Sequence, residues 1–146
     1  IYMLTVKLAA VGNLKEKYWR DAFSEYEKRL SRFCNFEVAE IKESTVEKEG
    51  AEILKKIGGY TVALCIEGKE MSSPEFSEFI AKKSMDFSKI TFIIGGSDGL
   101  SEKVKSATDF RLSFSPMTFP HQMMRIFFAE QLYRAFTITN NITYHK

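Results

Sequence analysis

Two histidines, His121 and His145, are the groups in this 146-residue chain best suited to accept a proton near neutral pH. His145 is the second-to-last residue, within the tripeptide "YHK", and is by type the best general base. Taken alone, a histidine at this place is more simply an exposed residue without a role. His121 precedes an apolar helix, and we expect it to pack the preceding loop rather than to act as a base. Neither histidine is spaced with a cysteine as a zinc site requires, so no metal is expected.

Arg134 and Tyr144 are the other side chains that could take part in chemistry. Arg134 lies in an apolar segment, where an unpaired charge is costly. It either forms an ordinary ion pair with Glu130, four residues earlier, or serves as an active-site cation. Tyr144 either stacks on a ligand ring or is merely exposed. The candidates for proton transfer and charge stabilisation are therefore His145, Arg134 and Tyr144.

Residues 92–100 read "FIIGGSDGL", an apolar run that ends in two glycines, with a third glycine soon after. A dinucleotide fingerprint needs G-x-G-x-x-G after the first strand, and the spacing from Gly95 to Gly99 does not match it. A P-loop needs Gly-Lys before Ser or Thr, whereas Gly68-Lys69 precedes Glu70. The stretch fits a tight turn without a ligand and a loop that approaches a ligand about equally well.

Three segments that follow predicted strands stand out: "LCIEGKEMSS" (64–73), "IIGGSDGL" (93–100) and "LSFSPMTFPHQMMR" (112–125). Parallel strands bind ligands outside their carboxyl ends, so these segments could share one site. The third contains Pro116 and Pro120, which stiffen it, and Met117 and Phe119, which a surface loop would not need. Such loops suit a flat heteroaromatic ring held by main-chain hydrogen bonds. They lack the basic side chains that a triphosphate would demand.

The elements that must position these residues follow from hydrophobic patterns. We expect strands at 4–12, 36–42, 60–66, 89–95 and 110–115, and helices at 15–33, 47–57 and 120–138. Two further helices are expected, one with Ser73 as N-cap and Pro74 at its first position, and a short one from Ser101. This alternation is typical of an α/β fold, with a mainly parallel five- to six-stranded sheet and helices on both faces. No linker or repeat is visible, so residues 1–146 are expected to form a single domain.

The helix at 120–138 is apolar around nearly its whole circumference, and a helix of this kind must be buried on all sides. One interpretation is an unusually enclosed core helix. The other, which we favour, is a homodimer whose second chain covers the remaining face. The apolar residues are Met123, Met124, Ile126, Phe127, Phe128, Leu132, Tyr133, Phe136 and Ile138.

Composition excludes some classes of protein. A net charge of +2 is too small for binding nucleic acid through a general positive field. The first helix does cluster basic residues, a weak signal because charged helix faces are usually just solvated: Lys15, Lys17, Arg20, Lys28, Arg29 and Arg32. No 18-residue apolar span and no signal-peptide pattern occur, so we expect a cytoplasmic protein without a membrane segment.

Six segments, in order and at compatible spacing, resemble the ribosomal RNA large subunit methyltransferase H family of the SPOUT superfamily. They are "VGNLKEKYW", "ALCIEGKEMSS", "FIIGGSDGLS", "LSFSPMTFPHQMMR", "EQLYRAF" and "YHK", and the resemblance runs from about residue 3 to residue 146. It implies a C-terminal deep trefoil knot, a homodimer, and S-adenosylmethionine bound in the knot. The implied reaction is N3-methylation of a pseudouridine, position 1915 in helix 69 of 23S ribosomal RNA, on the assembled ribosome.

The resemblance also implies which residues contact the cofactor: Leu64, Gly96, Ser115, Pro116, Met117, Thr118, Phe119 and Pro120. An N3–H group must lose its proton before the nitrogen can attack, so a base or a stabilising cation is required. We expect His145 to act on the target base, with Arg134 holding a carbonyl or phosphate and Tyr144 stacking on the ring. A tail residue can also become ordered only when RNA arrives. The alternatives are a SPOUT enzyme that modifies tRNA and a catalytically silent ribosome-binding module.

Overall fold

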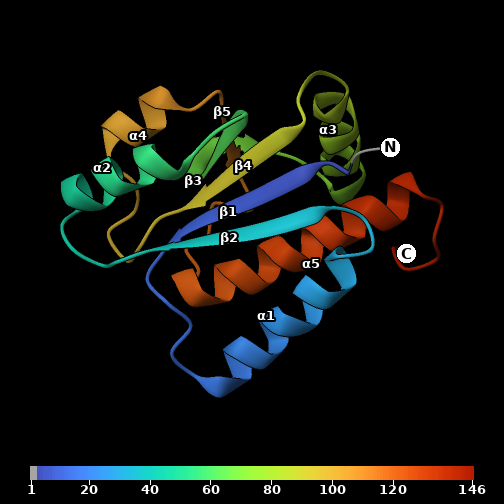
Figure 1. Cartoon of the computed structure of the whole chain (residues 1–146), viewed down its shortest axis with the longest axis horizontal. Helices are drawn as coiled ribbons and strands as arrows, with labels where there is room; N and C mark the ends of the chain where they lie inside the picture. Colours follow the sequence, from blue (N-terminus) through green and yellow to red (C-terminus); the bar gives the residue numbers. More distant parts are fainter. Residues whose placement is uncertain (1–2) are drawn as a thin grey trace.

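The computed structural model describes residues 3–146, and within them five strands form one parallel sheet in the order β2-β1-β4-β3-β5 (Figure 1). The strands are β1 (Thr5–Val11), β2 (Asn35–Ile41), β3 (Tyr60–Glu70), β4 (Lys89–Ile94) and β5 (Phe110–Ser113). Every pairing between neighbours is parallel. The prediction of a mainly parallel sheet is confirmed. A single domain over residues 1–146 stays a prediction, and residues 1–2 lie outside the described part.

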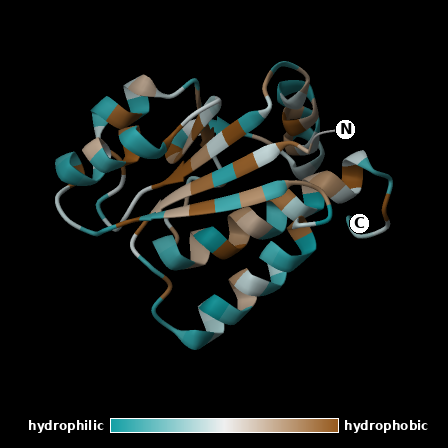
Figure 2. Cartoon of the chain, viewed as in Figure 1, coloured by the Kyte–Doolittle hydropathy of each residue, from teal (hydrophilic) through white to brown (hydrophobic). Residues whose placement is uncertain are grey.

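Helices cover both faces of the sheet, as predicted. On one face lie α1 (Lys17–Leu30), α3 (Ser73–Asp86) and α5 (His121–Thr139); on the other lie α2 (Val46–Lys56) and α4 (Glu102–Ala107). Neighbouring strand residues alternate between the two cores, since Leu8 and Phe92 join the first and Ala9 and Ile93 the second. Figure 2 shows hydrophobic residues concentrated along the strands, whereas the helices also carry hydrophilic ones.

Two predicted boundaries were wrong. The N-cap of α3 is Ser72, not Ser73, because the Ser72 hydroxyl accepts from the Glu75 N–H while the Glu75 carboxylate accepts from the Ser72 N–H. This reciprocal pair fixes the first turn and leaves the Ser73 hydroxyl free for a contact described below. Strand β3 continues to Glu70 rather than ending at 66, since its last residues rejoin β5 after a register shift.

The last helix, α5, has seven of its 19 residues buried within its own chain. It packs against α1, α3 and β4, and Phe128 and Leu132 have no exposed surface. Phe136 is also buried, so the chain itself encloses both Phe128 and Phe136. Phe127 remains 38% exposed and is the residue of this set that the fold leaves uncovered. The knot that the resemblance implies stays a prediction.

Candidate active site

The three predicted loops meet at one edge of the sheet, because β4, β3 and β5 are adjacent strands whose carboxyl ends lie together. They surround a cavity of about 670 Å³. Of the eight residues predicted to contact a cofactor, Pro116 does not line this cavity. The other seven do: Leu64, Gly96, Ser115, Met117, Thr118, Phe119 and Pro120. Residues up to 56 positions apart are thus brought to one site.

The glycines of "FIIGGSDGL" form a tight turn in which the chain approaches itself. A Cβ at Gly95 would lie 2.7 Å from the backbone of Gly99, and Gly99 has a φ of +79°, a conformation that glycine adopts freely. At Gly96 an added Cβ would instead point toward β1, where it would lie 3.0 Å from Cγ1 of Val11. A bulky side chain at Gly96 would therefore disturb β1 as well as the cavity, and binding tests need other positions.

The charged side chains that line this first cavity within residues 3–146 are Glu67, Asp98 and Lys105. Among the lysines and arginines of residues 3–146, Lys105 alone lines the cavity, and its ammonium forms an ion pair with Glu67. The hydrogen bond from Lys105 lowers the pKa of the Glu67 carboxyl. Burial, and next the charge of Glu67, raises the pKa of the Cys65 thiol, which keeps that sulfur protonated and weakly reactive. The cavity suits an aromatic ligand without phosphate groups.

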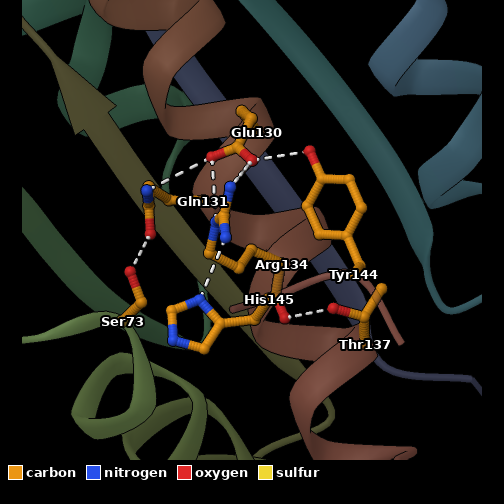
Figure 3. Close-up of polar contacts among 7 residues, drawn as sticks. All are labelled: Ser73, Glu130, Gln131, Arg134, Thr137, Tyr144 and His145. Atoms are coloured by element: carbon orange, nitrogen blue, oxygen red, sulfur yellow. Dashed lines mark hydrogen bonds and ion pairs between the residues drawn. The ribbon is translucent and has the colours of Figure 1, made fainter. Parts of the chain in front are cut away.

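The three predicted catalytic residues gather at the end of α5 (Figure 3). Arg134 Nη2 lies 2.7 Å from Glu130 Oε2, and its Nη1 lies 2.9 Å from His145 Nδ1. The Tyr144 hydroxyl donates to Glu130 Oε2 at 2.7 Å, and the Arg134 guanidinium lies over the Tyr144 ring, 4.8 Å from its centroid. Both readings of Arg134 are thus compatible with its contacts, since one guanidinium serves the i, i+4 ion pair and the histidine together. Within the described structure the tail already contacts α5.

The contacts restrict what each member of this cluster can do. Burial, and next the hydrogen bond to Glu130, raises the pKa of the Tyr144 phenol well above its usual range, so Tyr144 is a donor and not a base. The hydrogen bond to Glu130 raises the pKa of Arg134, which stays cationic. Because a guanidinium only donates, His145 Nδ1 accepts and Nε2 carries the hydrogen. In this arrangement neither ring nitrogen of His145 has a free lone pair, so His145 can act as a base only after it leaves Arg134.

Sequence reasoning missed Arg125, the largest fully buried side chain. It lies in the second turn of α5, is 1% exposed, donates to Glu40 Oε2 at 2.7 Å and also donates to the Gly12 carbonyl. His121, one turn earlier, lies 3.8 Å from Glu43 and packs beside the cofactor loop, in keeping with the structural role expected of it. The one signal in the sequence was an arginine between Met124 and Ile126 in an apolar helix.

The described residues contain neither a metal-binding cluster nor a helix that could span a membrane. No group of three or more histidine, cysteine, aspartate or glutamate side chains among residues 3–146 is placed to hold a metal ion. Within the same range, every helix is too short or too polar to cross a membrane.

Comparisons with known proteins agree with this architecture. A family model described as "Predicted SPOUT methyltransferase" matches residues 4–145. Ribosomal RNA large subunit methyltransferase H of Streptococcus uberis is 46% identical over 98% of this chain and 100% of the relative, and its counterpart in Fusobacterium nucleatum is 42% identical over the same shares. A solved structure of a probable methylase family protein from Haemophilus influenzae has a TM-score of 0.59 at 12% identity, covering 98% of this chain and 70% of that one, which shows the fold alone. The chain therefore belongs to the SPOUT methyltransferases, and within them to the ribosomal RNA large subunit methyltransferase H family.

Proposed function

We propose that this protein methylates ribosomal RNA of the large subunit, with S-adenosylmethionine as the methyl donor. The observation that carries this function is the 46% identity, over 98% of the chain, to a relative named for it. In finer detail, we propose that the acceptor is N3 of a pseudouridine, position 1915 in helix 69 of 23S ribosomal RNA, on the assembled ribosome. Such a substrate places the enzyme in the cytoplasm.

The residues of the first cavity fit S-adenosylmethionine. Leu64, Met117 and Phe119 offer apolar surface for an adenine ring, and the turn at Gly96 offers backbone close to a ligand. Neither a cluster of free cations nor a metal is needed, because the donor carries no phosphate. When bound, S-adenosylmethionine supplies an electrophilic methyl group on a sulfonium and leaves as a neutral thioether.

Orientation of the acceptor nitrogen is the main task left to the protein, since the displacement must be in line. We propose that the incoming base separates His145 Nδ1 from Arg134 Nη1, which are 2.9 Å apart. His145 then has a free lone pair for the N3 proton, and Arg134 can face a ring carbonyl and stabilise the anion. Tyr144 keeps Glu130 in place through its hydrogen bond and presents its ring to stacking. One displacement would thus prepare the proton acceptor and the cation together.

We also propose that the enzyme is a homodimer. Phe127 is 38% exposed and Tyr18 is 63% exposed, on the helices α5 and α1 that lie side by side (Figure 1). A second copy that covers these side chains would remove apolar surface from water. Static light scattering at micromolar concentration should give a dimer, and a monomer would exclude it.

Basic residues of α1 support RNA binding only in part. Lys17 pairs with Asp21, Arg29 pairs with Glu25, and Arg20 donates to the Leu14 and Lys15 carbonyls. The two ion pairs are exposed and weak enough to exchange for phosphate. Together with the small net charge, they favour recognition of a shaped ribosomal surface over capture of free RNA.

Mass spectrometry of RNA from cells with and without the gene tests the function directly. Loss of an N3-methylated pseudouridine from 23S ribosomal RNA is expected. Loss of a tRNA modification would identify a tRNA enzyme instead, and unchanged RNA would identify a silent ribosome-binding module.

The two cysteines offer a test of the cofactor site that does not depend on activity. Cys65 lines the first cavity, whereas Cys34 is buried elsewhere, and burial raises the pKa of the Cys34 thiol to about 12. Cys65 should react slowly with a thiol reagent at pH 8, and saturating S-adenosylmethionine should protect it. Cys34 should react only on unfolding, with or without the cofactor. Equal labelling of Cys65 in both conditions would place the cofactor elsewhere.

A further inference from the structure

A second cavity, of about 660 Å³, lies on the other side of the cofactor loop. It is bounded by α1, by the start of α3 and by one face of α5. Four residues line both cavities: Ser113, Phe114, Ser115 and Phe119. The two cavities therefore adjoin along these shared residues, and two substrates of a transfer reaction need such a neighbourhood.

The lining of the second cavity favours a neutral ring over an anion. Among residues 3–146, no lysine, arginine or histidine lines it, and Glu130 contributes a carboxylate. A phosphate would meet that negative charge without a cation at the wall. The rings of Tyr26, Phe76 and Phe119 instead present flat apolar surface, and aromatic side chains of this kind bind bases by stacking.

Gln131 supplies a hydrogen-bond donor whose direction is fixed (Figure 3). The Ser73 hydroxyl donates to Gln131 Oε1 at 2.7 Å, and Gln131 Nε2 donates to Glu130 Oε1 at 3.2 Å. These two contacts orient the amide from both ends. An amide nitrogen carries two hydrogens, and in the described structure the contact with Glu130 uses one of them. The second is available to a carbonyl oxygen in the cavity.

We propose that the second cavity binds the target base, a planar pyrimidine with two carbonyls beside an N–H, and that Gln131 donates to one of those carbonyls. This assignment rests on the proposed function and adds the place and the recognition of its acceptor. Arg134, Tyr144 and His145 do not line this cavity, but Glu130 does, and its contacts with Gln131, Arg134 and Tyr144 put the catalytic cluster next to the edge of the base that would face Glu130. The aromatic walls hold the plane of the ring, and Gln131 fixes its rotation within that plane.

Gln131→Met removes the donor and keeps the length of the side chain. We expect kcat/KM for ribosomes to fall by roughly 10- to 100-fold, because a buried carbonyl loses its partner. Calorimetric affinity for S-adenosylmethionine and the oligomeric state by sedimentation should not change. The matched control is Gln122→Met on the same helix, outside both cavities, where the lost contact is an exposed one with the Lys15 N–H. The control should keep wild-type activity.

Saturation-transfer NMR with free pseudouridine at millimolar concentration measures base binding without methyl transfer. Wild type should bind it in the presence of saturating S-adenosylmethionine, and Gln131→Met should bind it more weakly. Competition with the cofactor, absence of binding to wild type, or full activity of Gln131→Met would overturn the assignment. Dissociation of a dimer by Gln131→Met would mean that a second copy fills the cavity, and would also overturn it. Wild type that binds pseudouridine but methylates no ribosomes would contradict the proposed function while leaving the base site supported.

Discussion

Two arginines of helix α5, nine residues apart, have opposite surroundings. Arg125 is 1% exposed and binds Glu40 and the Gly12 carbonyl, partners that are 85 and 113 residues away in the sequence. Arg134 is 24% exposed and binds Glu130 and His145, which are four and eleven residues away. Both guanidiniums lie in an apolar helix, yet one joins distant strands and the other organises a local cluster.

The different surroundings of the two arginines suggest different roles, stability of the fold for Arg125 and chemistry for Arg134. Arg125 ties the second turn of α5 to the carboxyl ends of β1 and β2, next to the loop that bounds both cavities. Arg125 lines neither cavity, and its Nε has no acceptor among the described residues. Arg134 is partly exposed to solvent and contacts His145 of the tail. We therefore expect loss of Arg125 to change the free energy of unfolding and loss of Arg134 to change the rate of methylation.

Arg125→Met should give the largest loss of stability. It leaves the buried Gly12 carbonyl without its donor, while Glu40 is 48% exposed and can regain water. We expect the free energy of unfolding to fall by about 2–4 kcal/mol, measured by urea denaturation. An Arg134→Met variant is the control, and its stability should fall by less than about 1 kcal/mol. Equal losses in the two variants would erase the contrast.

Deleting residues 144–146 tests the chemical side of the comparison. It removes Tyr144 and His145 from Arg134; neither residue lines a cavity, although Glu130 loses its hydrogen bond from Tyr144. Cofactor affinity should stay within a few fold, whereas methylation of ribosomes should fall by roughly 100-fold or more. Deletion of Lys146 alone is the control. A near-normal rate after the full deletion would make Arg134 the leading catalytic candidate.

Arg134→Lys refines the role of the guanidinium. A lysine keeps the charge, but it cannot serve both Glu130 and His145 with fixed planar geometry. We expect methylation to fall by about 10-fold, with an unchanged urea midpoint. Wild-type activity in this variant would show that charge alone is sufficient.

Glu40→Gln should have the smallest effect. The amide can still accept from Arg125, and the carboxylate it replaces is half exposed, so solvent already screens the ion pair. The free energy of unfolding should fall by less than about 1 kcal/mol. Glu37→Gln on the same strand, whose contact with Lys89 is 3.6 Å long, serves as control. A larger loss in Glu40→Gln would mean that the ion pair, and not the Gly12 carbonyl, explains the importance of Arg125.

Much of the fold was predictable because its signals are local. At β4 the residues on both faces of the strand are apolar, which identifies a buried strand. In α1 the apolar residues recur at helical spacing, which identifies an amphipathic helix, and both patterns lie among neighbours in the chain. The N-cap of α3 was misplaced by one residue, since Ser72 and Ser73 are equally good caps by type and only the reciprocal bond with Glu75 distinguishes them. Which apolar residues of α5 are buried within the chain could not be predicted, because sequence does not reveal how far α1 and α3 enclose this helix.

The sequence by itself determined the alternation of strands and helices, the three loops of the first cavity and the i, i+4 pair of Glu130 and Arg134. Each depends on residue type and on spacing along one element. Tertiary structure alone decided that Arg125 is buried against Gly12 and Glu40, that Gln131 meets Ser73, and that the cofactor loop has a cavity on each side. These contacts join residues 58 to 113 positions apart, and such pairs arise only when packing of the sheet and its helices brings them together.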